Sequence, residues 1–148
     1  MTPYQIETAL KKHRAWLLGE ITARRLDLSG VDLEGIDLTM AELRNSKFTG
    51  ARLARANLTR ASLRETVLNS MQVKAPGGDA SGMEWPANLA AANLMEADLT
   101  GADLTGANLM AANFSGAKLN GARLNDAKVD RAVFDGADLT DCRIPTLT

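Results

Sequence analysis

The chain has 148 residues, with 17 Lys and Arg against 18 Asp and Glu and a formal net charge of −1. That balance argues against a strongly basic nucleic-acid binder and gives no support to a strongly acidic surface. A single histidine and a single cysteine exclude a disulfide framework and a metal site built from His and Cys pairs.

Residues 1–20 are predicted to form a capping helix. Thr2, Pro3 and Gln5 match an N-cap, a first-turn proline and a capping-box partner, and Gly19 is a natural stop. The helix has a short apolar stripe, made of Ile6, Ala9, Leu10, Leu17 and Trp16. We expect this stripe to cover the first of the repeats that follow. The alternative, a helix lying on a membrane, would need a longer stripe.

A five-residue repeat fills most of the rest of the chain. Leucine or a close substitute recurs at every fifth position from Leu28 onward and, after one interruption, continues to Ile144. A step of five scatters side chains around an α-helix and puts successive ones on opposite faces of a straight strand. The pattern therefore predicts short extended segments joined by corners, so that the chain winds into a coil with its leucines inside.

The number of sides of this coil follows from rare residues that share a spacing. Phe114 and Phe134 lie twenty residues apart, and identical side chains stack well in successive turns of a solenoid. Twenty residues per turn give four repeats per turn. If the interruption holds six extra residues, one core column contains Leu28, Phe48, Leu68, Leu94, Phe114 and Phe134.

Three consecutive segments, 97–101, 102–106 and 107–111, read ADLTG, ADLTG and ANLMA. They resemble the pentapeptide-repeat family, whose motif is alanine, Asp or Asn, leucine and two variable residues. The resemblance implies an all-β solenoid, a right-handed quadrilateral β-helix with an N-terminal capping α-helix. One structural domain would then hold two repeat blocks, residues 24–73 and 87–145. The resemblance also implies a bacterial source, and the single cysteine makes the cytoplasm the expected location.

The interruption, residues 74–86, is predicted to be a loop that protrudes from the coil. It contains Pro76, Gly77 and Gly78, followed by Met83 and Trp85. In members of the resembled family that protect DNA gyrase from quinolones, loops that break the coil contribute to activity. We therefore take Met83 and Trp85 as candidate partner contacts. The alternative is a tolerated insertion with Trp85 folded onto the neighbouring face.

A second candidate contact is a column of arginines. Arg24, Arg44 and Arg64 are spaced by twenty, which predicts like charges stacked one turn apart. Such a column suits an anion or an acidic protein. The alternative is a solvated ladder relieved by nearby carboxylates such as Asp27 and Glu42.

No nucleophile elbow, phosphate loop or metal-spaced pair is present, so an enzyme is not expected, and neither is a cofactor. Cys142 takes an alanine position of the repeat, where packing is the expected role. The sequence predicts a non-enzymatic scaffold for protein–protein interaction, with an unidentified protein partner and no membrane partner. The alternative is a DNA-mimicking modulator of DNA gyrase. Family members often dimerise through their C-terminal turns, so a homodimer is a further hypothesis.

Overall fold

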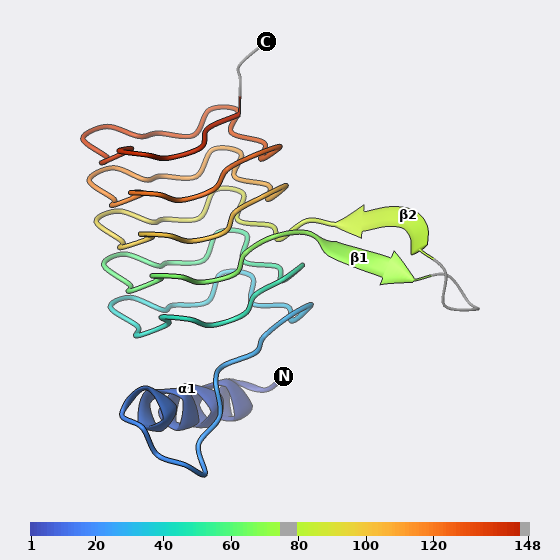
Figure 1. The fold of residues 1–148 in the computed structure, drawn as a ribbon, viewed down its shortest axis with the longest axis vertical. Coiled ribbons are helices and arrows are strands. Elements are labelled where there is room, and N and C mark those ends of the chain that lie inside the picture. Colours follow the sequence, from blue (N-terminus) through green and yellow to red (C-terminus); the bar gives the residue numbers. More distant parts are fainter. Residues whose placement is uncertain (75–79, 146–148) are drawn as a thin grey trace.

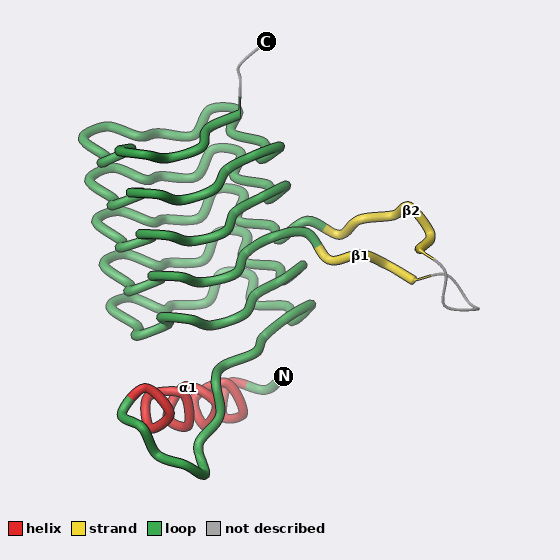
Figure 2. Tube along the Cα trace, in the orientation of Figure 1, coloured by secondary structure: helices red, strands yellow, loops and turns green. Residues whose placement is uncertain are grey.

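The computed structural model describes residues 1–74 and 80–145. In these ranges the chain forms one helix, α1 (Pro3–Leu17), and two strands, β1 (Met71–Lys74) and β2 (Ala80–Trp85). The remainder is a stacked coil of short bridged segments and turns, with α1 at one end and the two strands projecting from its side (Figures 1 and 2).

The coil is held together by parallel β-bridges between successive turns. Asp27 pairs with Lys47, and Lys47 pairs in turn with Val67, each twenty residues further along. Four such bridges join each turn to the next, as the run from Asp27 to Glu42 shows. These pairs confirm the twenty-residue turn that the sequence predicts.

The corners of the coil require a left-handed backbone at the last residue of each repeat. Gly30 has a φ of 67°, and the same corner position holds Met40 with a φ of 57°. The corner is closed by a hydrogen bond from Ala41 N–H to the carbonyl of Leu38, 3.0 Å long. Glycine adopts this conformation without strain, which explains its recurrence at the end of the repeats.

The interior is filled by columns of leucine and alanine that are almost completely buried. Phe114 is fully buried, and its ring stacks on Phe134 with 4.9 Å between centroids and 3° between planes. The predicted stacking of these two rings is therefore confirmed. Phe134 lies in the last turn, where its side chain is only partly buried.

The predicted continuation of this column is wrong. Val67 pairs with Asp103, 36 residues away, so the chain inserts 16 extra residues between these turns and not six. Phe48 and Leu68 therefore continue into Leu104, whereas Leu94 stacks below Phe114 in another column. All of these side chains remain buried, so the error concerns their column and not their place in the core.

The insertion is an antiparallel hairpin formed by β1 and β2, with Met71 opposite Trp85 and Gln72 opposite Glu84. The hairpin begins at Met71, before the predicted loop of residues 74–86. Val73 therefore lies in β1 and does not occupy the leucine position of the repeats that its spacing predicts. Directly after the hairpin the coil resumes. Leu53 N–H donates to the carbonyl of Asn88 over 2.6 Å, so the repeats before and after the hairpin pair in the same way as other successive turns.

Helix α1 begins with the expected capping box. Thr2 N–H donates to Gln5 Oε1 (2.8 Å), and Gln5 N–H donates back to Thr2 Oγ1 (3.2 Å). On its inner side His13 is fully buried. Its Nδ1 accepts from Leu26 N–H (3.1 Å), and its Nε2 lies 3.2 Å from Ser46 Oγ. The helix is thus joined by hydrogen bonds to the first two turns of the coil.

Candidate partner-contact surface

The hairpin carries large apolar side chains on a projecting element. Met83 is 59% exposed and Trp85 is 55% exposed. Gln72 donates a side-chain hydrogen bond to Glu84 across the pair of strands. In the described part of the chain, each strand pairs only with the other. Because a two-stranded hairpin is marginally stable alone, its conformation depends on how its base is held.

The base of the hairpin rests on a glycine corner of the coil. A Cβ atom at Gly50 would lie 2.8 Å from Met71 Cβ and 3.2 Å from the Trp85 carbonyl oxygen. Such distances are shorter than normal contacts, so the close approach requires glycine. No local pattern in the sequence indicates this contact, because it joins Gly50 to residues 21 and 35 positions away in different elements. The coil therefore fixes where the hairpin leaves its surface.

A groove of about 550 Å³ lies beside this base. Trp85 and Pro86 form its apolar part, while Arg52 and Asn88 add polar groups from the adjoining face. Arg52 lies 3.2 Å from Asp32 and is thereby held along the coil. A groove with an exposed aromatic side chain and a few polar groups has the composition typical of a protein-contact surface.

The predicted arginine column is only partly assembled. Arg44 and Arg64 occupy the same position in successive turns, while Arg24 precedes the first bridged residue, Asp27. Both stacked arginines have acidic neighbours: Arg44 Nε lies 2.9 Å from Glu42, and Arg64 Nη1 lies 3.9 Å from a carboxylate of the next turn, that of Asp98. Such pairs reduce the repulsion that made the column a candidate anion site.

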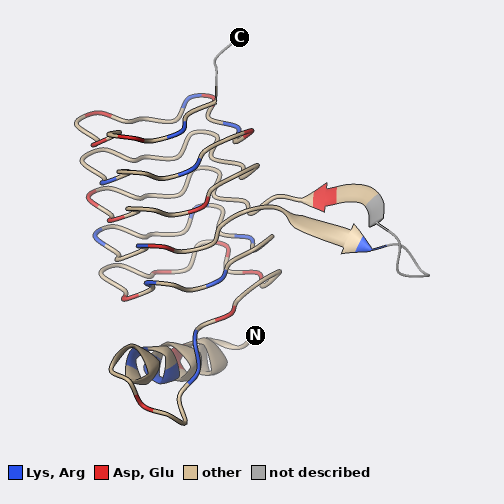
Figure 3. Cartoon of the chain, viewed as in Figure 1, with Lys and Arg blue, Asp and Glu red and all other residues tan. Residues whose placement is uncertain are grey.

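Charge of both signs is spread over the coil, as Figure 3 shows. One column alternates Asp98, Lys118 and Asp138 in successive turns. The Thr140 hydroxyl donates to Asp138 over 2.7 Å, and with a 2.7 Å bond from Asn120 Nδ2 it holds the pKa of that carboxyl below its usual range. The described coil thus presents mixed charge and not a continuous acidic face.

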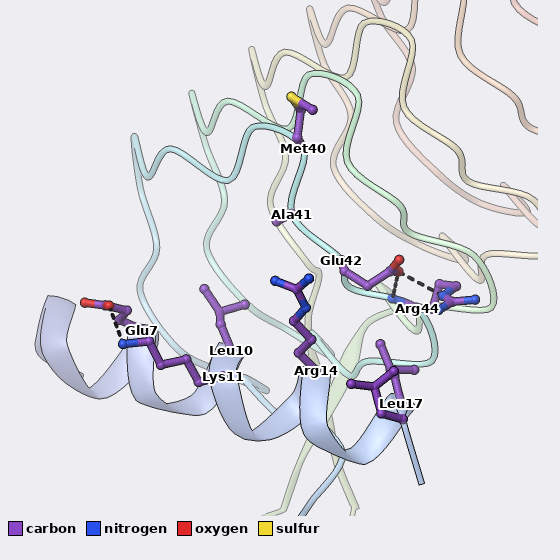
Figure 4. Close-up of a pocket in the computed structure, with 10 residues that line it drawn as sticks. Glu7, Leu10, Lys11, Arg14, Leu17, Met40, Ala41, Glu42 and Arg44 are labelled. Atoms are coloured by element: carbon purple, nitrogen blue, oxygen red, sulfur yellow. Dashed lines mark hydrogen bonds and ion pairs between the residues drawn. The ribbon is translucent and has the colours of Figure 1, made fainter.

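A second groove, of about 480 Å³, lies between α1 and the first turns (Figure 4). Leu10 and Leu17 of the helix line it, together with Met40 from a corner of the coil. Arg14 rises from the helix toward the coil, and Arg44 lies on the coil paired with Glu42. Sequence analysis did not find this groove, because the helix and the corner that form it share no motif.

The chemistry-bearing residues offer no assembled reaction centre in the part of the chain that the structure describes. No three His, Cys, Asp or Glu side chains there are grouped to hold a metal ion. Burial lowers the pKa of His13, whose two ring nitrogens are engaged with the coil. Burial also raises the pKa of the Cys142 thiol, and a thiol is a weaker nucleophile than a thiolate. No helix among the described residues is long and apolar enough to cross a membrane.

The sequence profile of pentapeptide repeats matches residues 27–69, 87–126 and 107–144, in eight copies. The chain belongs to the pentapeptide repeat family. The gap between the first two matches coincides with the hairpin. No curated protein matches the chain.

Several solved structures are similar to this chain. HetL, a pentapeptide repeat protein involved in heterocyst differentiation regulation in Nostoc sp. strain PCC 7120, is 29% identical over 85% of this chain and 65% of its own, with a TM-score of 0.34. Rfr23 from Cyanothece 51142 is 21% identical over 94% of this chain and 99% of its own, with a TM-score of 0.44. Full-length QnrB1, a plasmid-mediated fluoroquinolone resistance protein, is 21% identical over 82% and 61%, with a TM-score of 0.31. The chain thus spans less than two thirds of HetL and of QnrB1.

Proposed function

We propose that this chain is a non-enzymatic scaffold for protein–protein interaction, built on a right-handed quadrilateral β-helix, and that the hairpin provides the partner contact. The observation that carries the proposal is the exposure of Met83 and Trp85 on an element seated at Gly50. Tryptophan is enriched among the residues that dominate binding energy, and methionine adapts its shape to varied partners. The single cysteine, which forms no disulfide framework, supports a reducing compartment such as the bacterial cytoplasm.

The groove beside Trp85 supports the same proposal. A partner side chain lying in it would contact the indole ring and would meet Arg52 and Asn88 on the coil. Arg44 and Arg64 remain candidate contacts for an acidic segment of the same partner, and Arg24 remains one at the N-terminal end. Their acidic neighbours would then have to exchange ion pairs on binding, which limits the gain for each arginine.

The test is capture of bacterial proteins by the purified chain, with a matched pair of variants. The double variant M83S/W85S removes the exposed side chains of the hairpin. The control M95S/M110S removes two exposed methionines of the coil, which are 37% and 42% exposed. We expect a partner that binds the wild type and the control and is lost from the hairpin variant. Equal capture by all three proteins would contradict the proposal.

A second candidate function is a DNA-mimicking modulator of DNA gyrase. The acidic side chains of the last turns favour it, namely Asp126, Asp130, Asp135, Asp138 and Asp141. Interleaved Lys128, Arg131 and Arg143 weigh against it. Supercoiling by gyrase, with and without a quinolone, tests this function directly. Inhibition or drug protection that M83S/W85S loses would support it, and no effect at a large molar excess over gyrase would exclude it.

We also propose that two copies pair through their last turns. Val129, Phe134 and Leu139 are core positions that lie half-buried there, and Ile144 is 43% exposed. Pairing would bury these side chains against a second copy. Light scattering should give a dimer mass that I144D lowers to that of a monomer. A monomeric wild type at tens of micromolar would contradict this proposal.

A further inference from the structure

The N-terminal tip of the molecule exposes apolar side chains that the cap does not need. The segment after α1 lies at the end of the long axis of the molecule (Figure 1). Within it, Ile21 is 100% exposed and Leu18 is 78% exposed. Tyr4, 78% exposed, shares the outward side of α1 with Leu18, because a separation of fourteen positions makes nearly four whole turns. Ile6 and His13 face the coil on the opposite side.

The same tip carries basic side chains that make no ion pair with any residue in the described ranges. These are Lys12, Arg14, Arg24 and Arg25, all exposed. Lys11 is paired with Glu7 at 2.9 Å. The first half of the coil differs, because each of its arginines has a carboxylate within 4 Å. Those arginines are Arg44, Arg52, Arg55, Arg60 and Arg64.

The balance of charge at this end is positive. Residues 1–25 contain five Lys or Arg and two acids, Glu7 and Glu20, for a net charge of +3 when His13 is neutral. Figure 3 shows basic positions on α1 and on the segment that leads from α1 to the coil. The tip therefore combines unpaired cations with exposed side chains of Leu18 and Ile21.

We propose that the N-terminal tip docks on an anionic phospholipid surface. Leu18 and Ile21 would enter the boundary between headgroups and acyl chains, while Arg24 and Arg25 meet lipid phosphates. Tyr4 has the amphipathic ring that favours the same interfacial depth. The contact is peripheral and involves no spanning segment.

The chemistry favours lipid over a nucleic acid or an acidic protein. A polyanion would use the cations of the tip but would gain nothing from a fully exposed Ile21. Leu18 and Ile21 lie on exposed turns beside these cations, and a bilayer surface presents acyl chains and anionic phosphates together. This inference does not depend on the hairpin, which leaves the coil elsewhere along its side.

The test is flotation of the whole chain with vesicles of phosphatidylcholine alone or of phosphatidylcholine mixed with phosphatidylglycerol, whose anionic headgroups attract basic segments. We expect binding to the anionic vesicles and little to the neutral ones. L18S/I21S should weaken binding at least about tenfold by removing the inserted groups. R24Q/R25Q should weaken it on the order of twentyfold, at about fivefold for each cation.

Matched measurements make each outcome decisive. M83S/W85S, on the hairpin, should bind the vesicles as the wild type does. Because Leu18, Ile21, Arg24 and Arg25 are exposed, the variants should keep the circular dichroism and unfolding temperature of the wild type. Absence of vesicle binding, or binding unchanged in L18S/I21S, would overturn the proposal. Equal affinity for a DNA duplex, lost in R24Q/R25Q but retained in L18S/I21S, would assign the tip to polyanions instead.

Discussion

The coil and the hairpin are built from the same chain by opposite means. In the coil, side chains such as Leu99 and Phe114 are fully buried, and the backbone of each turn bonds to neighbouring turns. In the hairpin, two strands bond to each other while Met83 and Trp85 are more than half exposed. The two blocks of the coil meet across the hairpin through the bridge between Arg52 and Asn88.

This difference separates stability from recognition. In the coil, many similar buried positions each contribute to the free energy of folding, because every repeat packs against its neighbours. The hairpin adds little buried surface and interrupts no bridge of the coil. Its exposed side chains can therefore vary at small cost to folding, which is what a partner-contact element requires.

The largest expected effect is a core truncation. F114A removes a fully buried ring that stacks on Phe134, and we expect a loss of about 3–5 kcal/mol in the free energy of unfolding. W85A should change it by less than about 1 kcal/mol, because the side chain is largely exposed. Urea unfolding of both variants measures the contrast. Similar losses in the two would show that the hairpin is part of the folding core.

The next effect in size is a pH dependence of the free energy of unfolding, which arises from His13 on α1 and not from the hairpin. Burial lowers the pKa of His13, near which Glu42, Arg25 and Arg44 also act. An unfolded histidine titrates near pH 6.5, so below that pH the unfolded chain binds a proton that the folded chain resists. Stability should be full above about pH 6.5 and should fall as the pH is lowered from there toward the depressed pKa.

The geometry gives the reason for this sign. His13 Nδ1 accepts from Leu26 N–H, and a protonated ring can no longer accept there. Thermal unfolding at several values between pH 5 and 7.5 measures the effect, and H13Q should flatten the profile. Carboxylates with lowered pKa act in a separate window, below about pH 4. The aspartates among them are Asp27, Asp37, Asp98 and Asp138, and the glutamates are Glu7 and Glu96. An equally steep profile in H13Q would contradict the assignment.

A smaller effect compares two corners that differ only in whether the hairpin rests on them. Gly50 and Gly121 have φ values of 64° and 65°. G121A should cost about 1–2 kcal/mol from backbone strain alone, since a Cβ there meets no atom within 4 Å. G50A should cost more, because its Cβ would meet Met71 at 2.8 Å. Unfolding temperatures of the G50A and G121A variants measure the difference. Equal shifts would mean that Met71 moves away from a Cβ at residue 50 without cost.

The periodic part of the structure could be predicted from the sequence, because each repeat has the same spacing of buried alanine and leucine. Phe114 and Phe134 gave the twenty-residue turn, and Thr2 and Gln5 gave the helix start. The column of Phe48 could not be extended to the second block, because Val73 continues the five-residue spacing by coincidence while it lies in β1. The spacing alone does not show where the coil stops.

The contacts of the candidate surface were harder to predict than the repeats. Met83 and Trp85 could be predicted as candidates from their place in the interruption of the repeats, and the apolar Met71 and Val73, separated by Gln72 and followed by glycines, are a hairpin signal. The seat at Gly50 depends on a tertiary contact with Met71. The buried position of His13 likewise depends on Ser46, 33 residues away, which no local pattern indicates.

The most direct measurement is thermal unfolding of a variant in which residues 72–85 are replaced by a short Gly-Ser link. If the coil is the scaffold and the hairpin the contact element, the unfolding temperature should stay within about 3 °C of the wild type, since a link that closes the same ends costs less than about 1 kcal/mol. Partner capture should be lost from the same protein. A chain that no longer unfolds cooperatively, or that keeps its partner, would contradict the division of roles between coil and hairpin.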